Sequence, residues 1–196
     1  EQMGLHQPIF GGLTDKMQVQ NKGTFSLENK IHPKTEPEVY FITNKELKGK
    51  ISREEAFAAC EKIGVALEIL DSRFTGFKYF TLPDVVADNA SSAFFVLGDA
   101  VTIPSSLDFK NLRISLIQDG KPLFEDTTAA IMGDPLLSLC ELVTLQSQRG
   151  LTLPKGSIVL AGAATQAVEL KSGATMSAEI EKIGRVFLVK SRPSFV

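Results

Sequence analysis

The chain has 196 residues and a mass of 21.3 kDa, enough for one domain with a substantial core. A hydrophobic content of 43% and a charged content of 22% exclude an intrinsically disordered protein. Its 21 basic and 23 acidic residues nearly balance, so no basic surface favours nucleic acid or a membrane as partner.

Apolar runs between turn residues predict strands. The predicted strands cover 38–43, 65–73, 93–97, 112–118, 121–124, 157–162, 167–170 and 178–189. Asp119 and Gly120 form a favoured pair for a two-residue hairpin turn, because both positions of that turn require positive φ. Residues 8–23 are glycine-rich and aperiodic, and predict a loop with one short strand. Pro83 opposes a helix over 81–88, so we expect an extended or looped segment there.

Two helices carry start signals. Ser52 and Glu55 have the spacing of a capping box, which predicts a helix over 53–63 that stops at Gly64. Asp134 and Pro135 fit the cap and first turn of a second helix that ends at Gly150. Its apolar stripe consists of Leu136, Leu139, Cys140 and Val143.

Strands outnumber helices and most connections are short. We therefore expect one α+β domain, a mixed β-sheet roll or sandwich with flanking helices. Cys60 and Cys140, the only cysteines, both fall in apolar patterns that predict helix, which favours core thiols in a reducing cytoplasm over a disulfide. No continuous apolar run approaches the roughly 20 residues that span a bilayer.

Three carboxylates form a candidate metal site. Glu36 and Glu38 flank one residue at the start of a predicted strand, so their side chains point to the same face. Glu68 interrupts the apolar run of the next predicted strand, which a helical excursion can bring beside the first. Three carboxylates in apolar surroundings repel one another unless a cation lies between them. Ligation by oxygen alone favours Mg²⁺ or Mn²⁺ over Zn²⁺.

Simpler interpretations stay open at this point. A Glu-x-Glu pair is more often a solvent-facing strand, and Arg73 could neutralise Glu68 in place of a metal. His32 could act as a general base, although a loop-packing role is favoured. The cysteines have no histidine in their segments, so nucleophilic catalysis is not favoured.

Five ordered segments carry a resemblance that runs over nearly the whole chain. They are Pro8–Gly11, Ile31–Glu38, Leu67–Arg73, Val86–Ser92 and Gly133–Leu136. Together they resemble the hydratase/decarboxylase branch of the fumarylacetoacetate hydrolase superfamily, enzymes of the meta-cleavage degradation of aromatic compounds. The resemblance implies a mixed β-roll and a Mg²⁺ or Mn²⁺ ion held by Glu36, Glu38 and Glu68.

The resemblance also concerns what precedes Glu1. Members of the branch begin with a helical segment of about sixty residues that contains a lysine thought to act in catalysis. We therefore expect residues 1–196 to form a single catalytic domain without that segment, and the lysine to lie upstream of Glu1.

Ile9 helps to choose the reaction. Hydratases of the branch carry an aspartate at this position, and isoleucine cannot transfer a proton. Ile9, His32-Pro33-Lys34 and Ser91-Ser92 resemble the decarboxylases that act on 2-oxo-3-hexenedioate (4-oxalocrotonate). The expected reaction is its metal-dependent conversion to 2-hydroxypenta-2,4-dienoate and CO₂. A 2-oxopent-4-enoate-type hydratase, a hydrolase of C–C bonds and an inactive partner or scaffold are the alternatives.

Substrate contacts are expected from six residues: Ile9, Arg73, Asp88, Asn89, Ser91 and Thr165. Thr165 enters because the usual Thr-Gly-Gly of the family is replaced by Ala161-Gly162-Ala163, and the usual Gly-His-Pro is likewise replaced by Gly133-Asp134-Pro135. The resemblance implies a small 2-oxo dicarboxylic acid as the ligand. It also implies a cytoplasmic homo-oligomer and a possible complex with the hydratase of the pathway.

Overall fold

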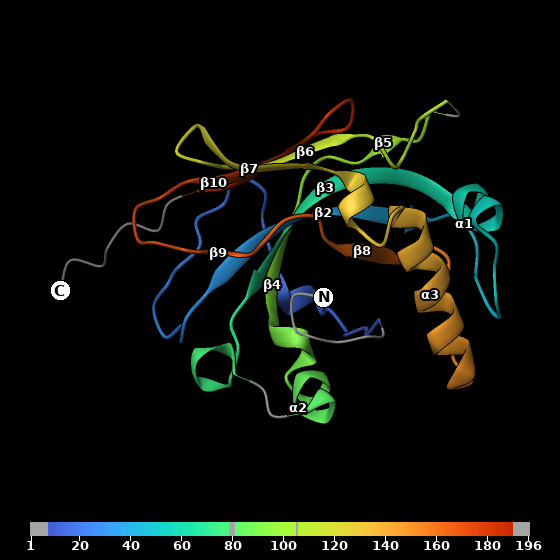
Figure 1. Cartoon of the computed structure of the whole chain (residues 1–196), viewed down its shortest axis with the longest axis horizontal. Helices are drawn as coiled ribbons and strands as arrows, with labels where there is room; N and C mark the ends of the chain where they lie inside the picture. Colours follow the sequence, from blue (N-terminus) through green and yellow to red (C-terminus); the bar gives the residue numbers. More distant parts are fainter. Residues whose placement is uncertain (1–7, 79–80, 105, 190–196) are drawn as a thin grey trace.

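The computed structural model describes residues 8–78, 81–104 and 106–189 (Figure 1). Its helices are α1 (Arg53–Ala59), α2 (Leu82–Ala87) and α3 (Pro135–Gln148). Short 3₁₀ turns cover Asp15–Met17, Thr75–Phe77, Asn89–Ser91 and Thr128–Ala130. The strands are β1 (Gln18–Val19), β2 (Lys34–Thr43), β3 (Cys60–Leu70), β4 (Ser92–Leu97), β5 (Val101–Thr102), β6 (Arg113–Gln118), β7 (Lys121–Thr127), β8 (Ile158–Ala163), β9 (Val168–Glu169), β10 (Met176–Ile180) and β11 (Gly184–Leu188).

The strands form two sheets that pack against each other. The larger sheet has the order β1-β4-β3-β2-β8, with β5 on β3 and β9 on β2. The smaller sheet has the order β11-β10-β6-β7 and covers one face of the larger one, with β10 and β11 over β3 (Figure 1). The expected α+β sandwich of mixed sheets with flanking helices is confirmed.

The long antiparallel pair β2 and β3 organises the larger sheet. Val39 of β2 lies opposite Val65 of β3, and both belong to the core between the sheets. Side chains alternate along a strand, so the intervening positions point to the opposite face of the sheet. Tyr40 occupies such a position, and its hydroxyl donates to the Gly98 carbonyl at 2.6 Å. Glu36, Glu38 and Glu68 follow the same alternation and lie on the face turned away from the smaller sheet.

Helix α3 closes one side of the domain, packed against α1 and β8 (Figure 1). Its predicted start is confirmed, because the Asp134 side chain accepts from the Leu136 amide at 2.9 Å. The segment Thr128–Gln148 is long and apolar enough to span a membrane by those two criteria alone. Its predicted stripe, however, contributes Leu136, Leu139 and Val143 to the core.

The first predicted helix is shorter than expected. The Ser52 capping box is confirmed, but α1 ends at Ala59, and Cys60 to Gly64 are already strand β3. The cause is a tertiary contact, because Gly64 permits the close approach of the Tyr40 ring. A Cβ at Gly64 would lie 2.3 Å from a ring carbon of Tyr40. Gly64 is therefore a packing glycine, and its prediction as a helix stop was wrong.

Two other assignments were wrong. The segment predicted as extended or looped over 81–88 contains α2, in which Pro83 occupies the first turn, a position that tolerates a missing N–H. The single strand predicted over 178–189 is two antiparallel strands, β10 and β11, joined by a turn with Lys182 at φ 65°. Lys182 rather than a glycine occupies the left-handed position of this turn, so the turn could not be recognised from its residues.

Candidate metal centre

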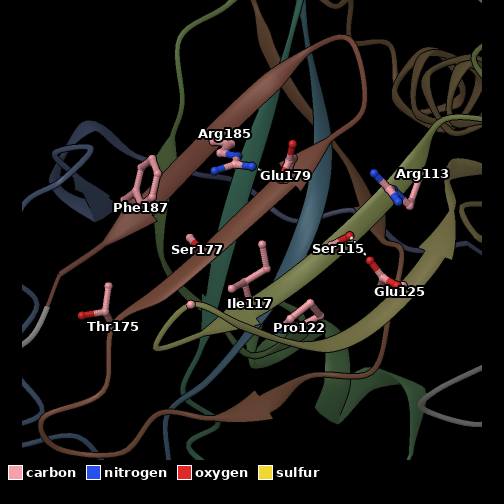
Figure 2. Close-up of a pocket in the computed structure, with 11 residues that line it drawn as sticks. Arg113, Ser115, Ile117, Pro122, Glu125, Thr175, Ser177, Glu179, Arg185 and Phe187 are labelled. Atoms are coloured by element: carbon pink, nitrogen blue, oxygen red, sulfur yellow. Dashed lines mark hydrogen bonds and ion pairs between the residues drawn. The ribbon is translucent and has the colours of Figure 1, made fainter.

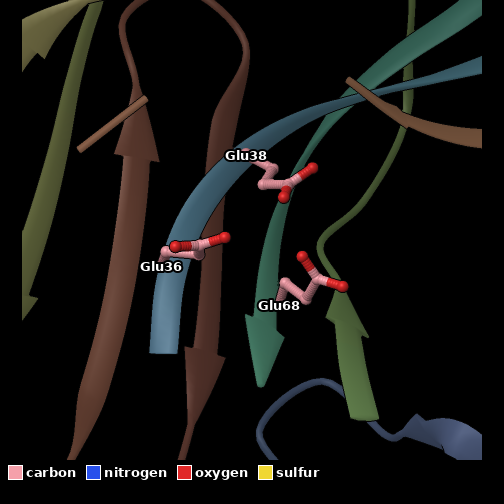
Figure 3. Close-up of side chains that lie close together, drawn as sticks. All are labelled: Glu36, Glu38 and Glu68. Atoms are coloured by element: carbon pink, nitrogen blue, oxygen red, sulfur yellow. The ribbon is translucent and has the colours of Figure 1, made fainter. Parts of the chain in front are cut away.

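Three carboxylates converge where β2 and β3 pair. Glu36 lies directly opposite Glu68, and Glu38 lies two residues along the same strand. Figure 3 shows the three side chains pointing toward one another from β2 and β3. Each offers one carboxylate oxygen, and these oxygens all lie within 4.8 Å of one another. Such spacing suits carboxylates that share one ion.

Burial makes this arrangement costly without a cation. Glu36 is 6% exposed and Glu38 is 2% exposed. Burial, and secondarily the charge of Glu68, raises the pKa of Glu36 to about 8. Burial and the charges of Glu68 and Glu36 raise the pKa of Glu38 well above its ordinary value, against the lowering effect of the Gly162 amide.

The donor set fits a hard divalent cation. The Oε2 atom of Glu36 is buried and has no hydrogen-bond partner among the described residues. Oε2 of Glu38 accepts from the Gly162 amide at 2.8 Å, which orients that carboxylate. An unpartnered buried oxygen beside two further carboxylates is the ligand type that Mg²⁺ and Mn²⁺ prefer.

The raised pKa of Glu36 predicts a pH-dependent stability for the metal-free protein. Between its ordinary pKa of 4.5 and the folded value of about 8, the folded state binds a proton that the unfolded state has lost. The free energy of unfolding should therefore fall as pH rises through this window, by at most about 5 kcal/mol at roughly 1.4 kcal/mol per pH unit. Urea unfolding in EDTA at several pH values measures the slope. Saturating Mg²⁺ should reduce this slope. A free energy of unfolding that does not change with pH in EDTA would contradict a raised pKa of Glu36 in the metal-free protein.

Asp71 ties the loop before β2 to the end of β3. Its carboxylate accepts from the Ile31 and His32 amides, with Oδ1 at 3.1 and 2.9 Å from the two nitrogens. The start of β2, which carries Glu36, is thereby fixed relative to β3. The predicted loop-packing role of His32 agrees with the contact of its ring with Phe77, at 4.6 Å between centroids.

Arg73 pairs with Asp88 rather than with Glu68, contrary to the alternative that the sequence left open. Its Nε lies 2.5 Å from Oδ1 of the buried Asp88, and its guanidinium also contacts the Asp88 carbonyl. Oδ2 of Asp88 accepts from the Ser72 and Ser91 hydroxyls at 2.8 and 3.1 Å. Three predicted substrate contacts, Arg73, Asp88 and Ser91, therefore form one hydrogen-bonded cluster. Contact with substrate stays a prediction for each of them.

Asn89 fastens the N-terminal segment. Its side chain accepts from the Gly12 amide and donates to the Gly12 carbonyl, both at 3.0 Å. Gly11 permits this approach, because a Cβ there would lie 2.4 Å from Oδ1 of Asn89. Residues Asn89, Ala90 and Ser91 all have φ between 51° and 66°, a costly run for residues with side chains. Strain of this kind is concentrated at functional sites.

The remaining predicted contacts lie on the segments around the carboxylates. Ile9 is half-buried, two residues before Gly11, on the segment that Asn89 holds. Thr165 is buried in the connection between β8 and β9, next to Ala164, whose amide donates to the Pro37 carbonyl at 3.1 Å. Pro37 stands between Glu36 and Glu38, so this connection borders the carboxylates.

Two residues of the site were not predicted from the sequence. Gly162 donates to Glu38, and only the position of a family motif, not spacing or composition, could have indicated it. Ser92 has a buried hydroxyl with no partner among the residues described, whereas the predicted Ser91 is engaged with Asp88. The doubling of serine was visible, but which of the two is free was not.

A cavity of about 390 Å³ lies elsewhere, on the outer face of the smaller sheet (Figure 2). Its lining includes an ion pair between Arg185 and Glu179 at 2.7 Å and a hydrogen bond from Ser115 to Glu125 at 3.0 Å. None of the three clustered carboxylates lines it. The candidate centre is therefore the carboxylate cluster rather than this cavity.

Several known proteins are similar to this chain over most of its length. The model of the family described as fumarylacetoacetate (FAA) hydrolase C-terminal matches residues 11–187. A 4-oxalocrotonate decarboxylase from a Pseudomonas species is 43% identical over 183 residues, 93% of this chain and 70% of that enzyme. A 2-keto-4-pentenoate hydratase from Burkholderia vietnamiensis is 33% identical over 189 residues, 95% of this chain and 71% of that enzyme.

A solved structure shares the fold closely. The 4-oxalocrotonate decarboxylase from Pseudomonas putida G7, complexed with magnesium and adipate, has a TM-score of 0.91 and 31% identity. The match covers 97% of this chain and 72% of that one. A second structure of the same enzyme holds calcium and acetate. The resemblance inferred from five sequence segments is confirmed, and the expected preference for a hard divalent cation agrees with these relatives.

Proposed function

Because this chain belongs to the fumarylacetoacetate hydrolase C-terminal family, we propose that it decarboxylates 2-oxo-3-hexenedioate to 2-hydroxypenta-2,4-dienoate in a reaction that depends on Mg²⁺ or Mn²⁺. Its relatives include decarboxylases and hydratases, which are both lyases. The observation that carries the proposal is the cluster of Glu36, Glu38 and Glu68, with one buried oxygen unpartnered among the described residues. The 43% identity to a decarboxylase favours this reaction over hydration.

The chain's own residues have separate tasks in this proposal. Glu36, Glu38 and Glu68 would hold the cation, and Gly162 would keep the Glu38 carboxylate in place. A bound divalent cation supplies Lewis-acid polarisation of the substrate's 2-oxo group. In the proposed reaction, the substrate's conjugated chain would take up the electron pair of the breaking C5–C6 bond as the distal carboxylate leaves as CO₂. A proton from solvent would complete the 2-hydroxy group of the product.

Ile9 would decide between decarboxylation and hydration. Addition of water to the diene needs a group that transfers a proton, and isoleucine has none. Arg73, Asp88, Asn89, Ser91 and Thr165 remain the other proposed substrate contacts. In this scheme, the Asp88 cluster and Asn89 position the segment that carries Ile9.

The reaction is tested with the full-length protein, 2-oxo-3-hexenedioate and Mg²⁺. Loss of substrate absorbance and release of CO₂ should both occur, and both should stop in EDTA. Addition of water to 2-hydroxypenta-2,4-dienoate is followed in parallel as the alternative activity. Release of no CO₂ by metal-loaded protein would refute the decarboxylase assignment. Size measurements in solution would test the proposed homo-oligomer, and mixing with a pathway hydratase would test the proposed complex.

Ile9→Asp is expected to shift the balance of the two reactions. The introduced carboxylate lowers decarboxylation by about 100-fold, because it adds charge and water at a half-buried apolar position. It also supplies a proton-transfer group, so hydration of the dienoate should increase. Both rates are measured on the same preparation, with Ile9→Val as the matched apolar control. If Ile9→Asp left both rates unchanged, Ile9 would not be the selector.

A further inference from the structure

We propose that Lys34 and Ser92 form a second anion subsite, which binds the distal carboxylate of a dicarboxylic substrate whose 2-oxo acid end lies at the metal centre. The proposal rests on the proposed function and adds to it the residues that select a dicarboxylic substrate. Lys34 and Ser92 are not among the six substrate contacts that the sequence predicts.

The register of the sheet places these two residues in one row. Lys34 of β2 lies opposite Leu70 of β3. Leu70 lies opposite Ser92 of β4, just beyond a register shift between Ile69 and Leu70. The neighbouring row consists of Glu36, Glu68 and Phe95. Lys34 and Glu36 are two residues apart on a regular stretch of β2, so they share the face that carries the carboxylates. The two rows are roughly 7 Å apart at the strand rise of about 3.3 Å per residue.

Ser92 presents a hydroxyl that is buried and unused. The residue is 7% exposed, and its Oγ has no hydrogen-bond partner among the residues that the structure describes. A buried hydroxyl without a partner costs free energy, and each such group in a folded protein calls for an explanation. A ligand oxygen that accepts a hydrogen bond from the Ser92 hydroxyl would explain why this group is buried without a partner in the protein.

Lys34 presents an ammonium group that is not neutralised. Glu169 lies opposite Lys34 in the register of β2 and β9, yet within the described part of the chain Lys34 makes no ion pair. Its Nζ lies instead 4.3 Å from the centre of the Phe77 ring. The His32 ring packs on the same phenyl group, and its Nε2 is also buried and unpartnered among described residues. Two basic side chains thus converge on Phe77 at this end of the site.

The spacing suits a six-carbon dicarboxylate. An extended six-carbon chain places its two terminal carbons roughly 6 Å apart, by ordinary bond lengths and angles. A ligand with its 2-oxo acid end at the row of Glu36 and Glu68 therefore brings its other end to the row of Lys34 and Ser92. Lys34 and Ser92 stand on either side of Leu70 in the register of the sheet. In the proposed subsite, the ammonium and the hydroxyl both donate to one carboxylate.

Such a subsite acts on binding rather than on bond cleavage. The ammonium stabilises the bound carboxylate, whereas neutral CO₂ gains nothing from it. Loss of Lys34 should therefore raise KM without lowering kcat. A residue that merely supported the fold would lower kcat when removed.

The test compares two inert ligands that differ only in the distal group. Calorimetric titration in Mg²⁺ measures the Kd of 2-oxoadipate and of 2-oxohexanoate, which lacks the second carboxylate. The unmodified protein should prefer 2-oxoadipate by about 10- to 100-fold, the effect of a charge-assisted hydrogen bond. Lys34→Met should abolish the preference, Lys34→Arg should keep most of it, and Ser92→Ala should reduce it by about 5-fold.

Lys30→Met is the matched control, because the Lys30 ammonium also lies over a phenyl ring, 4.8 Å from that of Phe94, but precedes β2. It should leave the preference intact. The subsite is refuted if the unmodified protein does not distinguish the two ligands, or if Lys34→Met still does. Failure of the proposed reaction looks different, because CO₂ release would then be absent while the preference for 2-oxoadipate persists.

Discussion

Replacing Glu36 with glutamine is expected to remove Mg²⁺ binding and to make the metal-free protein more stable. Metal affinity should fall by at least about 100-fold, because losing a direct ligand costs more than losing an outer residue that orients one. Turnover that depends on the metal should fall with it. The same substitution removes one of three mutually repelling carboxylates, so the two effects have opposite signs.

The gain in stability follows from the burial of the cluster. Glu36 lies opposite Glu68 and beside Glu38, and its pKa of about 8 reflects the cost of ionising it there. The introduced amide carries no charge and can donate to a neighbouring carboxylate. At pH 8 in EDTA, the free energy of unfolding should rise by about 1–3 kcal/mol.

Glu61→Gln is the control for this experiment, since Glu61 is an exposed carboxylate on the same strand β3. It should change neither the Mg²⁺ affinity measured by calorimetry nor the urea midpoint. An unaltered Mg²⁺ affinity in Glu36→Gln would rule out Glu36 as a ligand. A large loss of stability in EDTA would instead show that Glu36 makes favourable contacts in the metal-free protein. Repulsion from the neighbouring carboxylates would then not be its main interaction there.

Replacing Asp88 with alanine is expected to destabilise the protein by about 2–3 kcal/mol, even when it is saturated with Mg²⁺. Asp88 is 2% exposed and accepts from Ser72, Ser91 and Arg73. Its removal leaves two buried hydroxyls and a guanidinium without that acceptor. The estimate is below that for a fully buried ion pair because the Arg73 side chain is 46% exposed.

The same substitution should also lower kcat/KM by about 100-fold, as expected when a site is displaced by about 1 Å. The Asp88 carboxylate holds Ser91, the last residue of the left-handed turn that begins at Asn89. If this turn relaxes, Asn89 no longer holds Gly12 and the segment that carries Ile9 moves. Urea unfolding and steady-state rates measure the two effects. Asp126→Asn, on the exposed strand β7, should change neither.

Full stability together with full activity in Asp88→Ala would show that the cluster neither holds the turn nor positions Ile9. Full stability with reduced activity would instead support a direct contact of Asp88 with substrate, which the sequence predicts.

The sequence pattern predicted most of the helix starts and turns that depend on local interactions. The helix cap at Ser52, the Asp134 start of α3 and the hairpin at Asp119-Gly120 form as expected, because each depends on neighbours within a few residues. Errors occurred where distant contacts override local preference. Gly64 is strand rather than helix stop because the Tyr40 ring occupies the space that its side chain would fill.

For the site, the sequence indicated which side chains could hold a cation. Alternation along β2 and the isolated Glu68 were enough to propose three oxygen ligands, because the period of a strand is a local property. Which groups are free to bind depends on the tertiary fold. The fold pairs Arg73 with Asp88 rather than with Glu68. Ser91 is hydrogen-bonded to Asp88, whereas the Ser92 hydroxyl has no partner among the described residues. The register of the strands aligns Lys34, Leu70 and Ser92 in one row. Strand register and hydrogen-bond pairing depend on contacts between residues far apart in the chain, which periodicity does not encode.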